Sequence, residues 1–169
     1  MSKSMDEQVE VTIKEEDMYQ FMLHCEYKRV MGIVYLLISI TCLVLFPFSL
    51  IWGDTALTLL LLAGGLFHTL FTPLSLKLKA KRQVLMNEAY KEPFLYTINE
   101  DGLVIEQKEN KFEYQWEELL KVVQTKTLVL FFLNKRLAFI MPIRNCEESI
   151  EDILSILKEQ VPEKKLNLR

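Results

Sequence analysis

Residues that commonly build metal, disulfide and redox sites are scarce in this chain. It has three cysteines, Cys25, Cys42 and Cys146, and two widely separated histidines, His24 and His68. No Cys-x-x-Cys pair occurs, which argues against disulfides and a metal site and predicts free thiols with no cofactor. S-acylation of Cys25 beside a membrane is an alternative use of that thiol.

Signatures of catalysis and of nucleic-acid binding are also missing. The chain has no Gly-x-Ser-x-Gly elbow, no phosphate-cradling loop and no His-Glu-x-x-His motif. Residues 1–29 carry four basic and seven acidic side chains, and residues 94–169 carry eleven and thirteen. Neither part has the concentrated positive charge that nucleic acid requires. We therefore expect neither an enzyme nor a nucleic-acid-binding protein.

Charge is almost absent from the segment between residues 30 and 76. It contains no Lys or Arg, and Asp54 is its one carboxylate. Residues 30–52 and residues 55–76 are each long enough for a helix to cross the ~30 Å core of a bilayer, which takes about 20 apolar residues. With only Gly53 and Asp54 between them, the two halves predict a transmembrane helical hairpin in an integral membrane protein.

Basic residues flank this hairpin on one side only. Such residues remain in the cytoplasm, so a multi-pass protein of the cell membrane with both termini cytoplasmic is expected. The N-terminus is acidic and lacks an Ala-x-Ala cleavage site, unlike a removable signal peptide. The basic residues either contact anionic lipid headgroups or only set the topology. The expected membrane-interface residues are Lys28, Arg29, Lys77, Lys79, Lys81 and Arg82, with Trp52 at the outer surface.

Both flanks of the hairpin carry further structure. Residues 1–29 are expected to form a strand with alternating Val9, Val11 and Ile13, followed by an amphipathic helix that runs directly into the first span. Residues 77–93 are expected to continue the second span as a cytoplasmic helix that Pro93 ends.

Residues 94–169 are expected to form a separate cytoplasmic domain. Alternating segments predict about six short strands, with a turn at Gly102 that uses a positive φ. Phe112, Tyr114 and Trp116 alternate with polar residues and are the predicted core of the domain. A C-terminal helix is then expected to bury an apolar stripe formed by Ile150, Ile153, Leu154, Leu157 and Val161.

The two spans also predict one interhelical polar contact. In a hairpin that turns at Gly53 and Asp54, Ser39 and His68 lie at equal depth. Small residues at 63–65 let the helices approach closely. A neutral His68 is therefore expected to form a hydrogen bond with the Ser39 hydroxyl or with the neighbouring Thr41.

The segment from Tyr96 to Arg144 resembles the C-terminal domain of the YcxB-like family of small bacterial membrane proteins. Thr97 with Gly102, Trp116, the apolar hairpin at residues 128–140 and Pro142 occupy the places of its motifs. Glu117-Glu118 and Ile143-Arg144 depart from the frequent Ser-Asp and Lys-Arg pairs.

The resemblance implies two membrane spans ahead of a pleckstrin-homology-like β-barrel, in which a meander of strands is closed by a C-terminal helix. Such a barrel needs seven strands, and residues 8–14 either supply the seventh or form a disordered tail. The resulting fold class is an α+β membrane protein, a two-helix transmembrane hairpin with a small cytoplasmic barrel.

Two functions follow. The first is a membrane-tethered cytoplasmic interaction module, which binds a protein partner, another copy or a lipid headgroup at the inner leaflet. The alternative is a subunit of a small transporter or channel, built by oligomerisation of the hairpin. Polar residues inside the membrane would favour the alternative.

Overall fold

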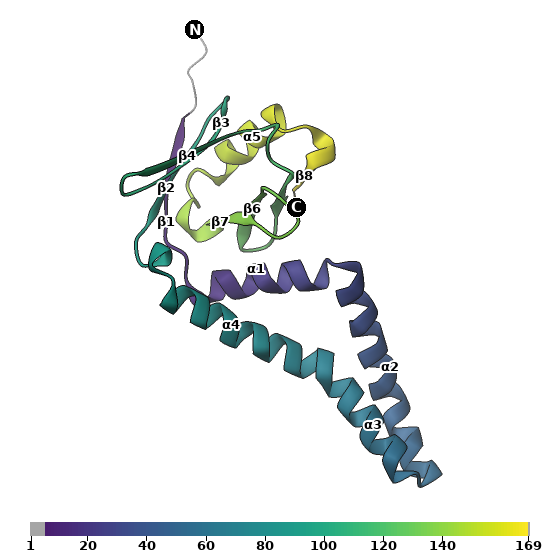
Figure 1. Ribbon diagram of the computed structural model, residues 1–169. Coiled ribbons are helices and arrows are strands. Elements are labelled where there is room, and N and C mark those ends of the chain that lie inside the picture. The colour runs from purple at the N-terminus through teal and green to yellow at the C-terminus, as the bar shows by residue number, and fades with distance from the viewer. Residues whose placement is uncertain (1–5, 169) are drawn as a thin grey trace.

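The computed structural model describes residues 6–168 and shows an α+β chain with two four-stranded sheets. Residues 1–5 and 169, which the expected terminal segments include, lie outside the described residues. Within residues 6–168, four α-helices lie between the first two strands, and a fifth follows the last long strand. Figure 1 shows the sheets gathered into one module, from which α2 and α3 project as a pair.

The first sheet joins the two ends of the helical region. Its order is β1-β2-β3-β4, and all its pairs are antiparallel. Val9 of β1 lies opposite Tyr96 of β2, so the N-terminal strand pairs within the sheet and is not a free tail. The strands are β1 (Glu7–Val11), β2 (Phe94–Ile98), β3 (Gly102–Gln107) and β4 (Asn110–Gln115).

The second sheet has the order β7-β6-β5-β8, in which β8 pairs in parallel with β5. Over residues 6–168 no strand of one sheet pairs with a strand of the other, so the expected closed barrel does not form. The turn after Gln115 separates β4 from β5 and lets the chain pass to the second sheet. The strands are β5 (Lys121–Gln124), β6 (Leu128–Phe132), β7 (Ala138–Pro142) and β8 (Leu166–Asn167).

Helix α5 (Ile150–Gln160) covers the core of the module, as its apolar stripe predicts. Ile153 and Leu157 are completely buried and belong to the same cluster as Leu130 and Tyr96. The centre of the core is the strand β6, whose five residues are all buried. One apolar core therefore connects both sheets and α5.

The apolar region forms two long helical segments that turn at Gly53. The first is α2 (Val30–Trp52), and the second runs through α3 (Thr55–Leu66), the π-helical turn η1 (Phe67–Phe71) and α4 (Thr72–Met86). Both are long and apolar enough to cross a membrane. Only 11% and 17% of their most apolar windows are buried, so these helices are not the core of the module.

Helix α1 (Glu15–Tyr27) does not continue directly into α2, contrary to expectation. Arg29 is extended, with ψ 140°, and the chain bends sharply there (Figure 1). The bend brings residue 32 against the end of α1, where a Cβ would lie 2.0 Å from the Glu26 carbonyl oxygen. Gly32 therefore permits the bend by having no side chain.

The expected helix at residues 77–93 is also shorter than predicted. Helix α4 ends at Met86, because Asn87 is extended and its side chain accepts a hydrogen bond from the Ala89 amide. Short 3-10 turns then occur at η2 (Glu88–Tyr90), η3 (Ile143–Asn145) and η4 (Glu163–Lys165).

Two expectations for the strands need correction. Phe112 is 48% exposed, although it alternates with polar residues, because the first four residues of β4 all lie beyond the core and are exposed. Tyr114 is half-buried against Phe139, and Trp116 is buried, with 2% exposed. Gly102 does not use a positive φ. A Cβ at residue 102 would lie 2.1 Å from the Tyr114 carbonyl oxygen, so close strand approach explains the glycine.

Candidate anion-binding cavity

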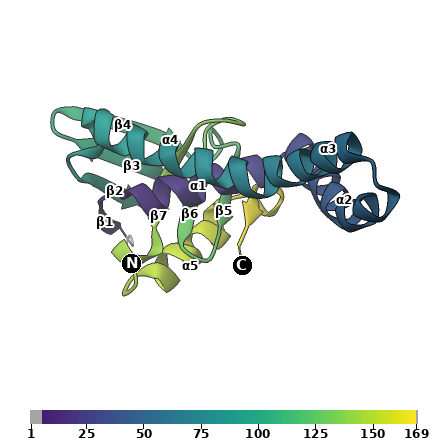
Figure 2. The ribbon, with the colours of Figure 1, turned by 90° about the horizontal axis from the view of Figure 1, so that it is seen from below.

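A cavity of about 650 Å³ lies between helices α1 and α4 and the β5–β6 part of the second sheet. Figure 2 shows α1 and α4 lying side by side across the module, with α2 and α3 projecting beyond them. The cavity is therefore at the junction between the module and the apolar helices. Residues from both sides of the hairpin and from the second sheet contribute to its wall.

Positive charge dominates this wall. Six cationic side chains line the cavity, against one carboxylate, that of Glu26. Within residues 6–168 none of the six forms an ion pair. Uncompensated like charges repel one another, so an anion placed between them would be stabilised. The six are Lys28, Arg29, Lys79, Lys121, Lys135 and Arg136.

An apolar surface accompanies these charges. Its residues come from α1, α4 and the second sheet, and they are Phe21, Met22, Leu76, Leu120 and Phe132. The Lys121 ammonium lies 4.6 Å from the centre of the Phe132 ring, in a cation–π contact. The cavity thus offers charge and apolar contact to the same ligand.

His24 and Cys25 also face the cavity. Burial, followed by the charges of Lys121 and Lys28, lowers the pKa of His24. Burial likewise raises the pKa of the Cys25 thiol, and the nearby cations only partly oppose this effect. Both groups therefore favour their neutral forms, and neither neutralises the six cations.

Local structure explains how these side chains reach one place. On α4, Leu76, Lys79 and Gln83 are spaced three and four residues apart, so they share one face of the helix. Lys135 and Arg136 belong to the turn between β6 and β7, where the Asn134 side chain accepts hydrogen bonds from the Arg136 and Leu137 amides. These bonds fix the conformation of the turn, whose Lys135 and Arg136 line the cavity.

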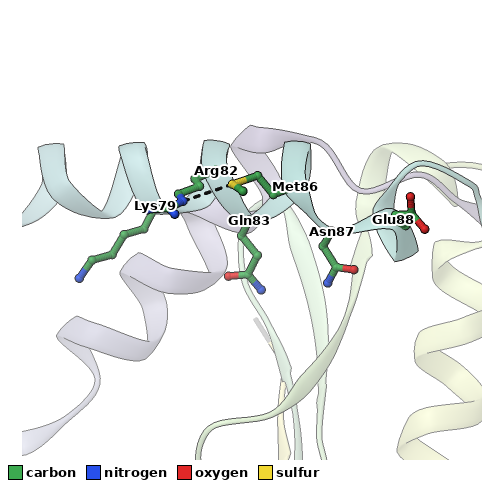
Figure 3. Close-up of a pocket in the computed structure, with 6 residues that line it drawn as sticks. All are labelled: Lys79, Arg82, Gln83, Met86, Asn87 and Glu88. Atoms are coloured by element: carbon green, nitrogen blue, oxygen red, sulfur yellow. Dashed lines mark hydrogen bonds between the residues drawn. The ribbon is translucent and has the colours of Figure 1, made fainter.

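A second, shallower groove of about 570 Å³ follows the exposed side of α4 (Figure 3). Lys79 and Gln83 line both the groove and the cavity. The Arg82 Nε donates to the Met86 sulfur, which holds the guanidinium along the helix. Because one helix and the turn after it supply all its residues, the groove gives a ligand less enclosure than the cavity does.

The residues expected at the membrane interface lie in different places in the structure. Lys28, Arg29 and Lys79 line the cavity, whereas Arg82 lines the groove. Lys77 and Lys81 are exposed on α4, and Trp52 is exposed at the far end of α2. Sequence reasoning missed Lys121, the first residue of β5. It also missed Lys135 and Arg136, for which the charged turn after β6 was the sequence signal.

The expected contact between Ser39 and His68 is not made. Ser39 donates to the Gly64 carbonyl oxygen at 2.9 Å, and Nδ1 of His68 forms a hydrogen bond with the Thr72 hydroxyl at 3.0 Å. The π-helical turn that contains His68 adds a residue to the helix and changes the register. His68 consequently packs against Tyr35 instead of Ser39, with the centroids of the two rings 5.9 Å apart.

No cluster of three or more His, Cys, Asp or Glu residues suited to a metal ion occurs in residues 6–168. All three cysteines are free thiols. Burial raises the pKa of Cys146 to about 11, with Glu147 adding to the effect.

Comparison with known proteins adds one family. The model of the family described as YcxB-like protein matches residues 98–157, from the end of β2 into α5. This match confirms the resemblance seen in the sequence. The curated proteins gave no match, and neither did the solved structures.

Proposed function

We propose that this chain, with its YcxB-like segment at residues 98–157, is a membrane-tethered interaction module that binds an anionic ligand at the inner surface of the cell membrane. The observation that carries the proposal is the group of six cations at the junction of the module with the apolar helices, none of which forms an ion pair within residues 6–168. Cations at such a position attract anionic lipids or acidic partners.

The proposed topology is a multi-pass protein with both termini in the cytoplasm. The pairing of β1 with β2 supports it, since these strands precede and follow the hairpin and lie in one sheet. Basic residues at the module end of the helices support it as well. The Gly53 turn then faces the outside.

A pleckstrin-homology-like arrangement is part of the proposal. Strands β1 to β4 in one sheet, β5 to β7 in the other, and a C-terminal helix supply the seven strands and closing helix that such domains need. In this arrangement the ligand site lies on the side of the second sheet that faces α1.

The test is to purify the full chain in a mild nonionic detergent and identify the bound molecules by native mass spectrometry. We expect a stoichiometric anionic ligand on the wild type and its loss from the cavity triple variant, Lys121→Gln with Lys135→Gln and Arg136→Gln. The control triple variant changes Lys126, Lys158 and Lys164, which are exposed and do not line the cavity, to Gln. Retention of the same ligand by both triple variants would contradict the proposal.

One observation favours the alternative of a transporter or channel subunit. Nε2 of His68 is buried and has no hydrogen-bond partner, and the residue is 4% exposed. Ionisable residues within membranes often mark pathways for ions or protons. This alternative would be supported by a proton flux into proteoliposomes that the wild type shows and His68→Leu lacks.

A further inference from the structure

We infer that the ligand of the cavity is a diacyl phospholipid with an anionic headgroup, which enters sideways from the inner leaflet. This inference rests on the proposed function and names the ligand class for its site. The phosphate would lie among the cations of the cavity, and part of an acyl chain would lie along its apolar wall.

The first argument is the continuity between the cavity and the apolar helices. Lys28 and Arg29 line the cavity and directly precede Val30, the first residue of α2. Val30 is 76% exposed and Met31 is 54% exposed. On the other helix, Leu76 in the cavity wall is followed by the exposed Leu78. A lipid can therefore pass from the hairpin surface into the cavity while its chains stay on apolar contacts.

The second argument is the composition of the wall. A small water-soluble anion would pair with the cations but would leave the exposed surfaces of Leu76 and Leu120 in water. Burying such side chains against an acyl chain is favourable, because it removes apolar surface from water. A lipid uses both parts of the wall, so it matches this cavity better than a soluble phosphate does.

The third argument concerns the origin of the cations. Lys28 and Arg29 come from the bend between α1 and α2 and Lys79 comes from α4, next to the apolar hairpin. Lys121, Lys135 and Arg136 come from the second sheet and its turn. The two groups surround the same space from opposite sides. A headgroup held between them would join the module to the membrane surface, with charge-assisted bonds from both.

The experiment uses the full chain, delipidated in nonionic detergent, with dioleoyl phosphatidylglycerol, dioleoyl phosphatidylcholine or glycerol phosphate added. Binding is measured by native mass spectrometry at increasing ligand concentration. We expect one bound phosphatidylglycerol, at least ~10-fold weaker binding of phosphatidylcholine, and no adduct with glycerol phosphate. The cavity triple variant should reduce phosphatidylglycerol binding ~10-fold or more, and the control triple variant should leave it unchanged.

A second pair of variants tests the acyl contact. Leu120 lines the cavity and is 44% exposed, so Leu120→Ser should not unfold the module. The matched control is Leu137→Ser, because Leu137 is 55% exposed and lies outside the cavity wall. Only Leu120→Ser is expected to weaken phosphatidylglycerol binding.

The outcomes separate this inference from the proposed function. Equal binding of glycerol phosphate and phosphatidylglycerol, with no effect of Leu120→Ser, would overturn the lipid assignment and leave the anion site intact. An acidic protein that copurifies and is lost only from the cavity triple variant would likewise overturn the lipid assignment and leave the anion site intact. Absence of every anionic ligand from the wild type, or loss of ligand unrelated to the cations, would overturn both.

Discussion

Asp17 and Arg144 form a bidentate ion pair that joins the start of α1 to η3, the turn after β7, 127 residues apart in the sequence. The Asp17 side chain is 4% exposed and also accepts a hydrogen bond from the Lys14 amide at 2.7 Å. Arg144 donates in addition to the Thr12 carbonyl oxygen. The pair holds α1 against the second sheet and thereby holds one wall of the cavity in place.

Replacing Arg144 with Met should destabilise the module by roughly 3 kcal/mol. Loss of one partner leaves the buried Asp17 carboxylate uncompensated, and the value is at the low end of the usual range because the arginine side chain is 36% exposed. Denaturant titration of the full chain in detergent would measure the change. The double variant with Asp17→Asn should lose less stability than the two single variants lose together, because both substitutions break the same ion pair. A single-variant effect below ~0.5 kcal/mol would show that the pair does not hold α1.

Trp116 should be the most sensitive position in the turn between the sheets. The buried indole donates to the carbonyl oxygens of Asn99 and Glu100, both at 3.2 Å. Trp116→Ala should cost about 3–5 kcal/mol by emptying a core site. Trp116→Phe keeps most of the volume and should cost closer to ~1 kcal/mol for the lost hydrogen bonding. Equal losses of unfolding free energy for the two variants in denaturant titrations would show that the hydrogen bonds, and not the filled volume, account for the effect of Trp116.

The titration of His24 should report on the cavity. Its pKa is lowered by burial and by Lys121 and Lys28, so the folded state binds its proton less readily than the unfolded state. Between the folded pKa and the unfolded value near 6.5, stability should therefore fall as the pH falls. An anion in the cavity should raise the His24 pKa, which NMR titration with and without phosphatidylglycerol would measure. A pKa unchanged by the lipid would indicate that the anion binds elsewhere.

The Gly53–Asp54 turn should be reachable from outside the cell. A cysteine at Asp54 is expected to react with an impermeant thiol reagent in whole cells, in a background with Cys25→Ser and Cys42→Ser. Cys146 is buried and should remain unlabelled. Asp54 accepts a hydrogen bond from the Leu57 amide, so the substitution should cost about 1 kcal/mol of helix stability. Labelling only after the membrane is permeabilised would reverse the proposed orientation.

Sequence alone was sufficient for the features that depend on neighbouring residues. The long apolar segments, the alternation along the strands and the stripe on α5 follow from local periodicity, and residues 98–157 suffice to match the YcxB-like family model. Local patterns were less reliable at ends and edges. Phe112 has the alternation of a core residue, yet it is exposed because the first four residues of its strand lie beyond the core.

Only the tertiary structure decided which distant segments meet. The pairing of β1 with β2 crosses the whole helical region, and the partner of Asp17 lies near the other end of the chain. The cavity likewise draws its cations from the bend between α1 and α2, from α4, and from the second sheet with its β6–β7 turn. Such contacts leave no periodic signal, because they depend on how complete elements pack together and not on the spacing of residues within one element. For this reason the sequence determined the elements of this protein, and their packing decided its candidate site.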